Sequence, residues 1–366
     1  MSIQNLLRLS ETKALILKHL PDVQVGFARL DRPLSIEFYD TFLAQGLHGE
    51  LEYLARHRDA KADPQKWIPF AQSAIALSIG YVTKENLAPN AGKRVAFYAT
   101  YTENQEDYHF EIRRRLAPVL EELKSLYPEA SFRLALDTEP ILERDLAYRA
   151  GLGWVGKNTC LIHRDRGSLF FLAEILTSLA LPEENLAAKV LSPDHCGTCT
   201  RCLDACPTGA LLEARKLDAR LCISNWTIES KSIAPKGLRE KFGDWFFGCD
   251  ICQTVCPWNG KVFGRDNMSA HAHPVLPRDE RGRDTLVAEL RDILTLSNRE
   301  LERRFAASPL KRARGSGLKR NALYVVANLK LVELASEVQA LTEDNKLGEL
   351  ATEVLADLNL RSGREN

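Results

Sequence analysis

The chain has 366 residues, of which 45% are hydrophobic and 27% are charged, and Lys plus Arg equals Asp plus Glu at 49 each. This length suits two or three domains, and this composition is that of a globular protein with buried cores, which excludes a disordered or fibrous chain. The balanced charge neither favours nor opposes an acidic partner. The start of the chain lacks a signal-peptide core, and the longest apolar run, residues 169–181, is interrupted by Glu174 and is too short to cross a bilayer. We therefore expect a cytoplasmic protein.

Residues 1–185 predict an α/β domain in which helices and strands alternate. The segment SAIALSIGYV at 73–82 is typical of a buried strand. Residues 107–128 have the apolar periodicity of a helix that stops at a proline. A further strand, SFRLALDT, leads to Asp137, and a helix is expected over 140–151, from its proline to its glycine.

Asp137 is the strongest candidate acid outside the cysteines. It follows a strand and precedes a helix, which is where ligands bind in α/β folds. The alternative is an ordinary helix N-cap, and the spacing alone favours that alternative.

The segment GLGWVGKNTCLIH at 151–163 packs three glycines next to Lys157 and Asn158. Its backbone N–H groups could cradle phosphate or amide groups. It lacks both the Walker A spacing and the dinucleotide fingerprint, and a tight structural turn explains it equally well.

Eight of the nine cysteines lie between residues 196 and 256, in two runs that each end in Cys-Pro. The first run has the spacing C-x2-C-x2-C-x3-C-P, the second has C-x2-C-x3-C-P, and one cysteine stands between them. This is the spacing of bacterial [4Fe–4S] ligation, in which the fourth cysteine of a run binds the other cluster. The rule assigns to one cluster Cys196, Cys199, Cys202 and Cys256, and to the other Cys206, Cys222, Cys249 and Cys252.

Other readings of the cysteines are weaker. Structural zinc sites usually come as two separated Cys-x2-Cys pairs, and a disulfide framework does not suit a long chain without a secretory signal. Cys160 lies in an apolar stretch and is expected in the core. Two adjacent low-potential clusters form an electron path, which indicates a redox protein.

From about residue 285 the sequence predicts paired amphipathic helices that resemble a short HEAT-type solenoid. Between residues 301 and 320 there are seven basic residues against one acid. Such a patch suits a phosphate backbone, and a solvated helical face is an equal alternative on this observation alone.

Taken together, these segments resemble the epoxyqueuosine reductase family over about residues 95–325. The matching segments are YATYTENQEDYHF, LDTEPILERDLAYRAGLGWVGKNTCLI, HCGTCTRCLDACPTGAL, LDARLCISNWTIE, FGCDICQTVCPWN and LKRNAL. More distant relatives are the corrinoid reductive dehalogenases, which are typically exported with a twin-arginine signal that this chain lacks. The resemblance implies an α/β cobalamin-binding catalytic domain at 1–185, a ferredoxin-like domain with two [4Fe–4S] clusters at 186–265, and a helical HEAT-like tRNA-docking region at 285–366.

The resemblance also implies an activity. The family reduces epoxyqueuosine to queuosine at the wobble position of tRNA, the last step of queuosine biosynthesis, with a cobalamin reduced through two [4Fe–4S] clusters. An acid protonates the departing oxygen, and the matching residue here is Asp137, so with the resemblance catalysis becomes the favoured role of this residue. An unidentified low-potential electron donor is implied, and nothing suggests an obligate interface, so we expect a monomer.

Further positions match by resemblance. Those that match cobalamin-contacting positions are Lys61, Phe97, Asp137, Asn158, Ser224 and Asp250. Those expected to dock the tRNA are Lys311, Arg312, Arg314, Lys319 and Arg320. Glu139 departs from the family pattern, where glycine is common. The D-x-H-x-x-G signature is absent because Ile112 stands where glycine is needed, so a histidine-ligated cobalt is not expected.

Two other functions stay open from the sequence. A two-cluster electron-transfer protein would share the cysteines, but it needs no α/β domain ahead of them. A corrinoid iron–sulfur reductase of a small molecule would share the cofactors, but the basic helical segment favours RNA over a small substrate.

Overall fold

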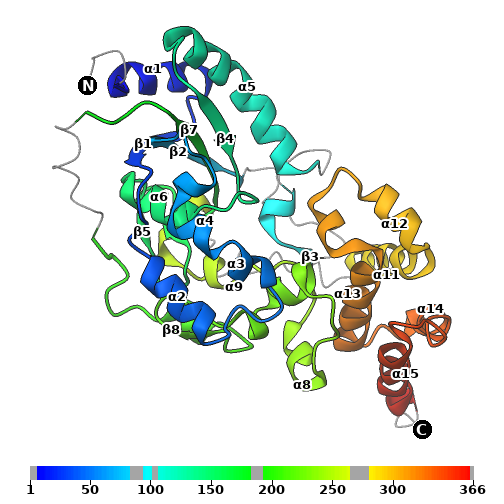
Figure 1. The fold of residues 1–366 in the computed structure, drawn as a ribbon. Helices are drawn as coiled ribbons and strands as arrows, with labels where there is room; N and C mark the ends of the chain where they lie inside the picture. Colours follow the sequence, from blue (N-terminus) through cyan, green and yellow to red (C-terminus); the bar gives the residue numbers. More distant parts are fainter. Residues whose placement is uncertain (1–5, 83–93, 101–105, 183–192, 264–279, 363–366) are drawn as a thin grey trace.

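The computed structural model describes residues 6–82, 94–100, 106–182, 193–263 and 280–362 (Figure 1). The predicted domain borders at 185–186 and at 265 lie outside these ranges. In the described part of the chain, no helix is both long and apolar enough to span a membrane.

The N-terminal part is built on one four-stranded sheet in the order β1-β2-β7-β4. These strands are β1 (Gln24–Arg29), β2 (Ser73–Gly80), β4 (Phe132–Ala135) and β7 (Phe170–Thr177). Every neighbouring pair is antiparallel, and Ile75 of β2 lies opposite both Phe27 and Ile175. The prediction of a strand at 73–82 is confirmed. The predicted α/β class is correct in that helices and strands together build the domain. It is wrong about the arrangement, because an antiparallel sheet belongs to the α+β class.

Helices α1 (Leu9–His19) and α5 (Tyr108–Leu126) cover one face of this sheet (Figure 1). Alternate strand residues such as Ile75 and Ile175 point to this face, where Leu116 and other buried residues of α5 pack on them. The prediction of a helix at 107–128 is confirmed, and Asp107 starts it as N-cap by accepting a hydrogen bond from the backbone N–H of His109.

Helix α6 (Glu143–Arg149) covers the opposite face. The strands present small side chains there, including Ala28, Ala76 and Ala135, which lets α6 lie close to the sheet. At Gly26 a Cβ atom would come within 2.3 Å of the Ala150 carbonyl oxygen, so only glycine permits this approach. The predicted helix start at Pro140 is wrong, because backbone hydrogen bonds between 136 and 141 form turns before the helix begins.

The remaining N-terminal elements connect the sheet to the cysteine region. Three short helices follow β1, and a small hairpin follows α6. They are α2 (Ile36–Ala44), α3 (Glu52–Arg56), α4 (Arg58–Ala62), β5 (Trp154–Val155) and β6 (Leu161–Ile162). Strand β3 (Arg94–Val95) leaves the sheet and pairs in parallel with β10 (Trp245–Phe247), which ties the cysteine region to the N-terminal part.

Each cysteine run contains a short helix, and these helices, α7 (Arg201–Asp204) and α9 (Ile251–Thr254), contact each other. Between them lie β8 (Leu211–Glu213), β9 (Lys216–Leu217) and α8 (Lys236–Arg239), and α10 (Gly260–Phe263) follows.

Five helices form the C-terminal part. They are α11 (Glu280–Thr295), α12 (Asn298–Arg304), α13 (Arg314–Leu329), α14 (Ala335–Gln339) and α15 (Gly348–Ser362). These helices do not form a separate core: Phe242, Trp245, Phe246 and Phe247 of the cysteine region pack in the same cluster as the buried face of α13. The cysteine region therefore has an apolar core, because this aromatic group is buried under the C-terminal helices.

Candidate active site and cluster-binding region

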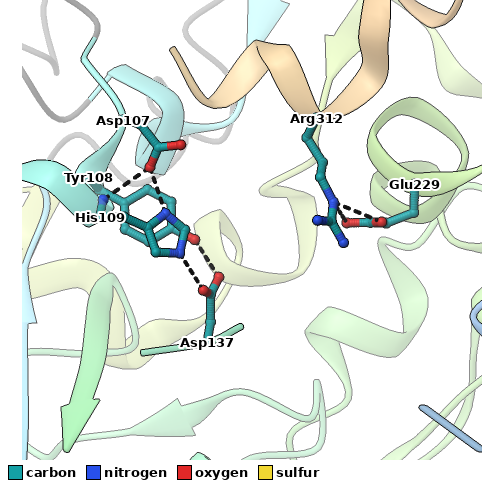
Figure 2. Close-up of polar contacts among 6 residues, drawn as sticks. All are labelled: Asp107, Tyr108, His109, Asp137, Glu229 and Arg312. Atoms are coloured by element: carbon teal, nitrogen blue, oxygen red, sulfur yellow. Dashed lines mark hydrogen bonds and ion pairs between the residues drawn. The ribbon is translucent and has the colours of Figure 1, made fainter. Parts of the chain in front are cut away.

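Asp137 lies two residues beyond the end of β4, with its side chain 47% exposed. One carboxylate oxygen accepts a hydrogen bond from His109 Nε2 at 2.5 Å, and the other accepts one from the Tyr108 hydroxyl (Figure 2). The strand end and the first turn of α5 therefore bring an acid, an imidazole and a phenol together. Sequence reasoning named only the acid.

The start of α5 fixes the imidazole. Asp107 accepts from His109 Nδ1 at 2.6 Å and from the His109 backbone N–H at 3.0 Å (Figure 2). Both ring nitrogens thus face carboxylates, so the doubly protonated imidazolium satisfies both hydrogen bonds. The Tyr108 ring stacks between His109 and Phe171, with centroid distances of 4.2 Å on both sides. The signal for this group was the tripeptide Asp-Tyr-His at a helix start, which had been weighed only as a cobalt-ligand motif.

The charges of Asp107, His109 and Asp137 shift one another's pKa values. Burial alone would lower the pKa of His109, but the hydrogen bonds to Asp107 and Asp137 outweigh it and raise that pKa to about 9. Burial alone would raise the pKa of Asp137, but the hydrogen bonds from His109 and Tyr108 leave it below its usual value. At neutral pH the transferable proton therefore resides on His109, and Asp137 is a carboxylate.

Lys61 and Glu143 lie beneath the loop that carries Asp137. The Lys61 ammonium at the end of α4 donates to the carbonyl oxygen of Ile141 at 3.2 Å. Burial lowers its pKa, and the nearby Glu143 opposes that effect. Burial, and then the negative charge of Asp137, raise the pKa of Glu143 to about 8. The structure therefore places Lys61 near the acid group formed by Asp137, His109 and Tyr108, because Glu143 lies within electrostatic reach of both Lys61 and Asp137.

Three other predicted cofactor contacts lie beside the second cysteine run. The backbone N–H of Phe97 donates to Asp250 at 2.7 Å, and the Asn158 amide donates to the carbonyl oxygen of Cys252 at 3.1 Å. Burial raises the pKa of Asp250 to about 6. Tyr98, next to Phe97, makes an edge contact with Tyr108 at 5.9 Å between centroids, so an aromatic pair links this region to the acid group.

Ser224 is half-buried, two residues after Cys222. Its carbonyl oxygen lies at 3.5 Å from the Thr227 hydroxyl. No described contact joins its side chain to Asp137 or to Asn158, so the structure places it by the cysteines only.

All nine cysteines lie in the described residues as free thiols. Cys256 lies within electrostatic reach of Cys196 and Cys202, and Cys222 lies within reach of Cys206 and Cys249, while Cys160 is within reach of both Cys256 and Cys222. Burial, followed by these neighbours, raises the pKa of the Cys256 thiol to about 12. Within the described ranges no three His, Cys, Asp or Glu side chains are gathered closely enough for a single metal ion.

Each of the two thiol sets that the spacing predicts consists of four soft thiol donors, the donor type that four-iron clusters take, and the crossed pairing stays a prediction. Cys160 is placed next to Cys252, whose thiol perturbs its pKa. The ninth cysteine is thus not remote from the second set.

The glycine-rich segment is a hairpin. Gly156 donates its backbone N–H to Cys160, which closes the turn between β5 and β6, and a Cβ at Gly153 would clash with the Ile162 carbonyl oxygen at 2.1 Å. Lys157 extends from this turn to the carbonyl oxygens of Gly197 and Cys199, at 2.6 and 3.0 Å. These contacts support the reading as a structural turn, and they brace the first cysteine loop.

The basic segment divides into an exposed and a buried part. Arg312 is half-exposed and pairs with Glu229 at 2.8 Å, and Figure 2 shows its guanidinium turned to Glu229, across a gap from Asp137. Arg320 is 2% exposed, and its guanidinium donates to the carbonyl oxygens of Trp226, Ser230 and Ser232. Lys319 is 8% exposed. Arg320 cannot contact RNA in this arrangement, because its donors are used inside the protein.

Two sequence families match parts of the chain. Residues 61–138 match the family described as "Epoxyqueuosine reductase QueG, DUF1730", and residues 195–259 match the family described as "4Fe-4S double cluster binding domain".

Named relatives cover most of the chain. The epoxyqueuosine reductase of Cyclobacterium marinum is 37% identical over 78% of this chain and 86% of its own length. That of Xanthomonas campestris is 38% identical over 75% of this chain and 74% of its own. A crystal structure of epoxyqueuosine reductase with an epoxyqueuosine-modified tRNA-Tyr stem loop has a TM-score of 0.73 at 28% identity, covering 96% of this chain and 90% of that chain. In a Bacillus subtilis structure with a TM-score of 0.75 and 28% identity, covering 96% of this chain and 91% of that chain, the catalytic loop that bears an aspartate is swung out of the active site.

Proposed function

The chain belongs to the epoxyqueuosine reductase family, and we propose that Asp137, His109 and the two thiol sets carry out the family's reaction here. The protein reduces epoxyqueuosine in tRNA, with cobalamin and two [4Fe–4S] clusters as its cofactors. The observation that carries the residue assignment is the proton-holding group at Asp137, joined by aromatic contacts to the second cysteine run.

The thiol sets would hold the clusters in the crossed pairing. Cys196, Cys199, Cys202 and Cys256 would bind the first, and Cys206, Cys222, Cys249 and Cys252 the second. The first loop is flanked by exposed residues such as Gly197 and Thr200, whereas the second run is flanked by the buried Asp250 and Thr254. We therefore propose that the first cluster, when bound, would be accessible to an electron donor, and that the second would lie on the side of Asp137.

Cobalamin would be held by Phe97, Asn158 and Asp250 on the side of the second run and by Lys61 on the side of Asp137. When bound, it supplies the electrons that open the carbon–oxygen bonds of the epoxide. The protein supplies the proton: His109 holds it between two carboxylates, and Asp137 presents it to the departing oxygen. Covering Asp137 with substrate removes water, which raises its pKa and favours this transfer.

Arg312 and its neighbours Lys311 and Arg314 would contact the tRNA backbone. Arg312 is exposed whereas Glu229 is half-buried, so a phosphate can approach the guanidinium from solvent. Arg312 also lies within electrostatic reach of Asp137. The modified nucleoside must leave the stacked anticodon to reach Asp137, as in other enzymes that act on a base.

The test is mass spectrometry of nucleosides from epoxyqueuosine-containing tRNA. The tRNA is incubated anaerobically with reconstituted protein and a strong reductant, with and without cobalamin. We expect loss of one oxygen from the modified nucleoside only when cobalamin is present. If both clusters and cobalamin are bound and the nucleoside is unchanged, the proposal fails and a small-molecule substrate becomes the leading alternative.

A further inference from the structure

A second carboxylic acid is buried in the sheet beneath the active site. Glu174 is in the middle of β7 and is 0% exposed. Its cross-strand neighbours are Ala76 on β2 and Ala135 on β4, and these small side chains leave room for its carboxyl group on the α6 face. Neither carboxyl oxygen finds a hydrogen-bond partner among the described residues.

Glu143, in the first turn of α6, is within electrostatic reach of Asp137, and Glu174 is within reach of both. Glu174 is therefore electrostatically linked to Glu143, and both are linked to Asp137. The Oε1 of Glu143 is also buried without a partner in the described part of the chain. The other charged groups that face Glu143 are Lys61, Arg144 and His109. Three carboxyl groups therefore extend from the active site into the core.

This cluster is unfavourable for folding alone. An ionised carboxylate without partners is costly in the interior, so the group stays protonated instead. Burial raises the pKa of Glu174 well above its usual value, in line with its place between two alanines. An aliphatic residue at this position would fill the space without that cost, which indicates that the carboxyl group serves the reaction.

The reaction needs more protons than Asp137 and His109 hold. Removing the epoxide oxygen breaks two carbon–oxygen bonds, consumes two electrons and two protons, and releases water and an alkene. His109, through Asp137, supplies one proton. We propose that Glu143 and Glu174 hold the second proton and deliver it to Asp137 after the first transfer. This inference rests on the proposed function.

The proton balance is then complete. The first proton goes from His109 through Asp137 to the oxygen as the first bond opens. The second goes from Glu143 through Asp137 to the same oxygen as it leaves as water. No described hydrogen bond joins Glu143 to Glu174 or to Asp137, so side-chain movement must bring these carboxyl groups into contact for each transfer. Glu174 then reprotonates Glu143, and solvent recharges the pair after product release. The electron pair comes from the bound cofactors, so no further reductant is required. Glu174 acts through its neighbours and is a positioning residue, since it does not touch the substrate.

The first test does not depend on activity. In the holoenzyme at neutral pH we expect an infrared C=O stretching band of a protonated carboxyl group that shifts to lower frequency in D2O. The band should weaken in Glu174→Gln and in Glu143→Gln. An unchanged band in both variants would overturn the proposal.

The second test is single-turnover kinetics with modified tRNA. We expect Glu174→Gln to lower the rate of oxygen loss by about tenfold or more, less than the loss of a direct general acid, because Glu174 acts through its neighbours. Glu174→Asp should restore part of the rate. Glu139→Gln is the matched control, because Glu139 is close to Asp137 in sequence but pairs with Arg133, and its rate should match the wild type.

The outcomes separate the two proposals. If the wild type removes the oxygen but Glu174→Gln and Glu143→Gln turn over within about twofold of it, the second proton does not come from this pair. If the wild type removes no oxygen, the proposed function itself fails. Cluster and cobalamin absorbance, recorded on the same samples, identifies a variant that has merely lost its cofactors, and Glu143→Gln then carries the test alone.

Discussion

The two faces of the four-stranded sheet are both buried, yet they differ in chemistry. The face under α1 and α5 is packed with large aliphatic and aromatic side chains such as Ile75 and Ile175. The face under α6 is lined with alanines, and it buries Glu174 among them. Odd-numbered residues of β7 such as Ile175 thus pack under α1 and α5, whereas the even-numbered Leu176 and Glu174 face α6, where Glu174 is within electrostatic reach of Asp137.

This difference shows that burial alone does not separate structural from functional residues. A buried carboxyl group without partners reduces stability, whereas a buried isoleucine adds to it. The same strand therefore carries both kinds of residue, and only the side-chain environment distinguishes them. Changes on the α6 face should lower activity more than stability, and changes on the α5 face should lower stability more than activity.

The largest expected effect is a loss of activity on changing Asp137, which follows the end of β4. Asp137→Asn removes the group that presents the proton, and turnover should fall by about 100-fold or more, while clusters and cobalamin remain bound. Oxygen loss from the modified nucleoside, measured by mass spectrometry in a single turnover, checks this. Asp165→Asn, which removes an exposed carboxylate paired with Lys261, is the control. Unchanged turnover in Asp137→Asn would return Asp137 to a structural role.

The opposite signature is expected under α5. Leu116→Ala removes a fully buried side chain and should lower the free energy of unfolding by about 2–5 kcal/mol, through lost burial and the cavity left behind. Activity per folded molecule should stay the same. Anaerobic urea titration measures the stability, and Leu34→Ala, at a side chain 61% exposed, should change it little. A loss of activity without a loss of stability would contradict the division between the faces.

The acid face should also make stability depend on pH. The pKa of Glu143 rises from 4.5 to about 8 on folding, and that of His109 from 6.5 to about 9. The folded protein therefore keeps protons that the unfolded chain releases, so stability should fall as the pH rises from about 6 to about 9. Urea midpoints at these two pH values measure the fall, and Glu143→Gln should reduce it. An equal fall in Glu143→Gln would mean that Glu143 does not carry the effect.

The smallest effect is expected at the exposed part of the basic segment. Arg312→Gln should weaken tRNA binding modestly and lower the slope of log affinity against log salt by about 1, as for one lost phosphate contact. Filter binding at several salt concentrations measures this. Arg304→Gln is matched, because Arg304 is also an exposed arginine paired with a carboxylate, Asp292. Equal losses in both variants would show a diffuse charge effect and not a contact of Arg312.

The cysteines and the long elements were accessible from the sequence, because their signals are local. Motif spacing predicted the two thiol sets, and periodicity predicted β2 and α5. The antiparallel order of the strands was not accessible, since it depends on pairing between segments far apart in the chain. Arg320 read as part of a basic surface patch, because a charge pattern does not say which face of a helix is covered.

The group formed by Asp137, His109 and Tyr108 could be predicted only in part from the sequence. Asp137 was found through its place after a strand, but His109 joins it only through the fold. Glu174 did leave a visible signal, as the one charge within the apolar run 169–181. Its meaning depends on Ala76 and Ala135 beside it and on Glu143 above it, and these neighbours come from three separate segments.

The aromatic cluster of Phe242, Trp245, Phe246 and Phe247, buried under the C-terminal helices, has a consequence for how the molecule can be divided. A chain truncated ahead of α11 would expose these rings to water next to Cys249. The C-terminal helices are therefore not an independent domain that can be removed without harm to the cysteine region. Heating should therefore bleach the iron–sulfur absorbance and melt these helices in one transition. The helices proposed to bind the tRNA and the region proposed to bind the clusters should therefore unfold together.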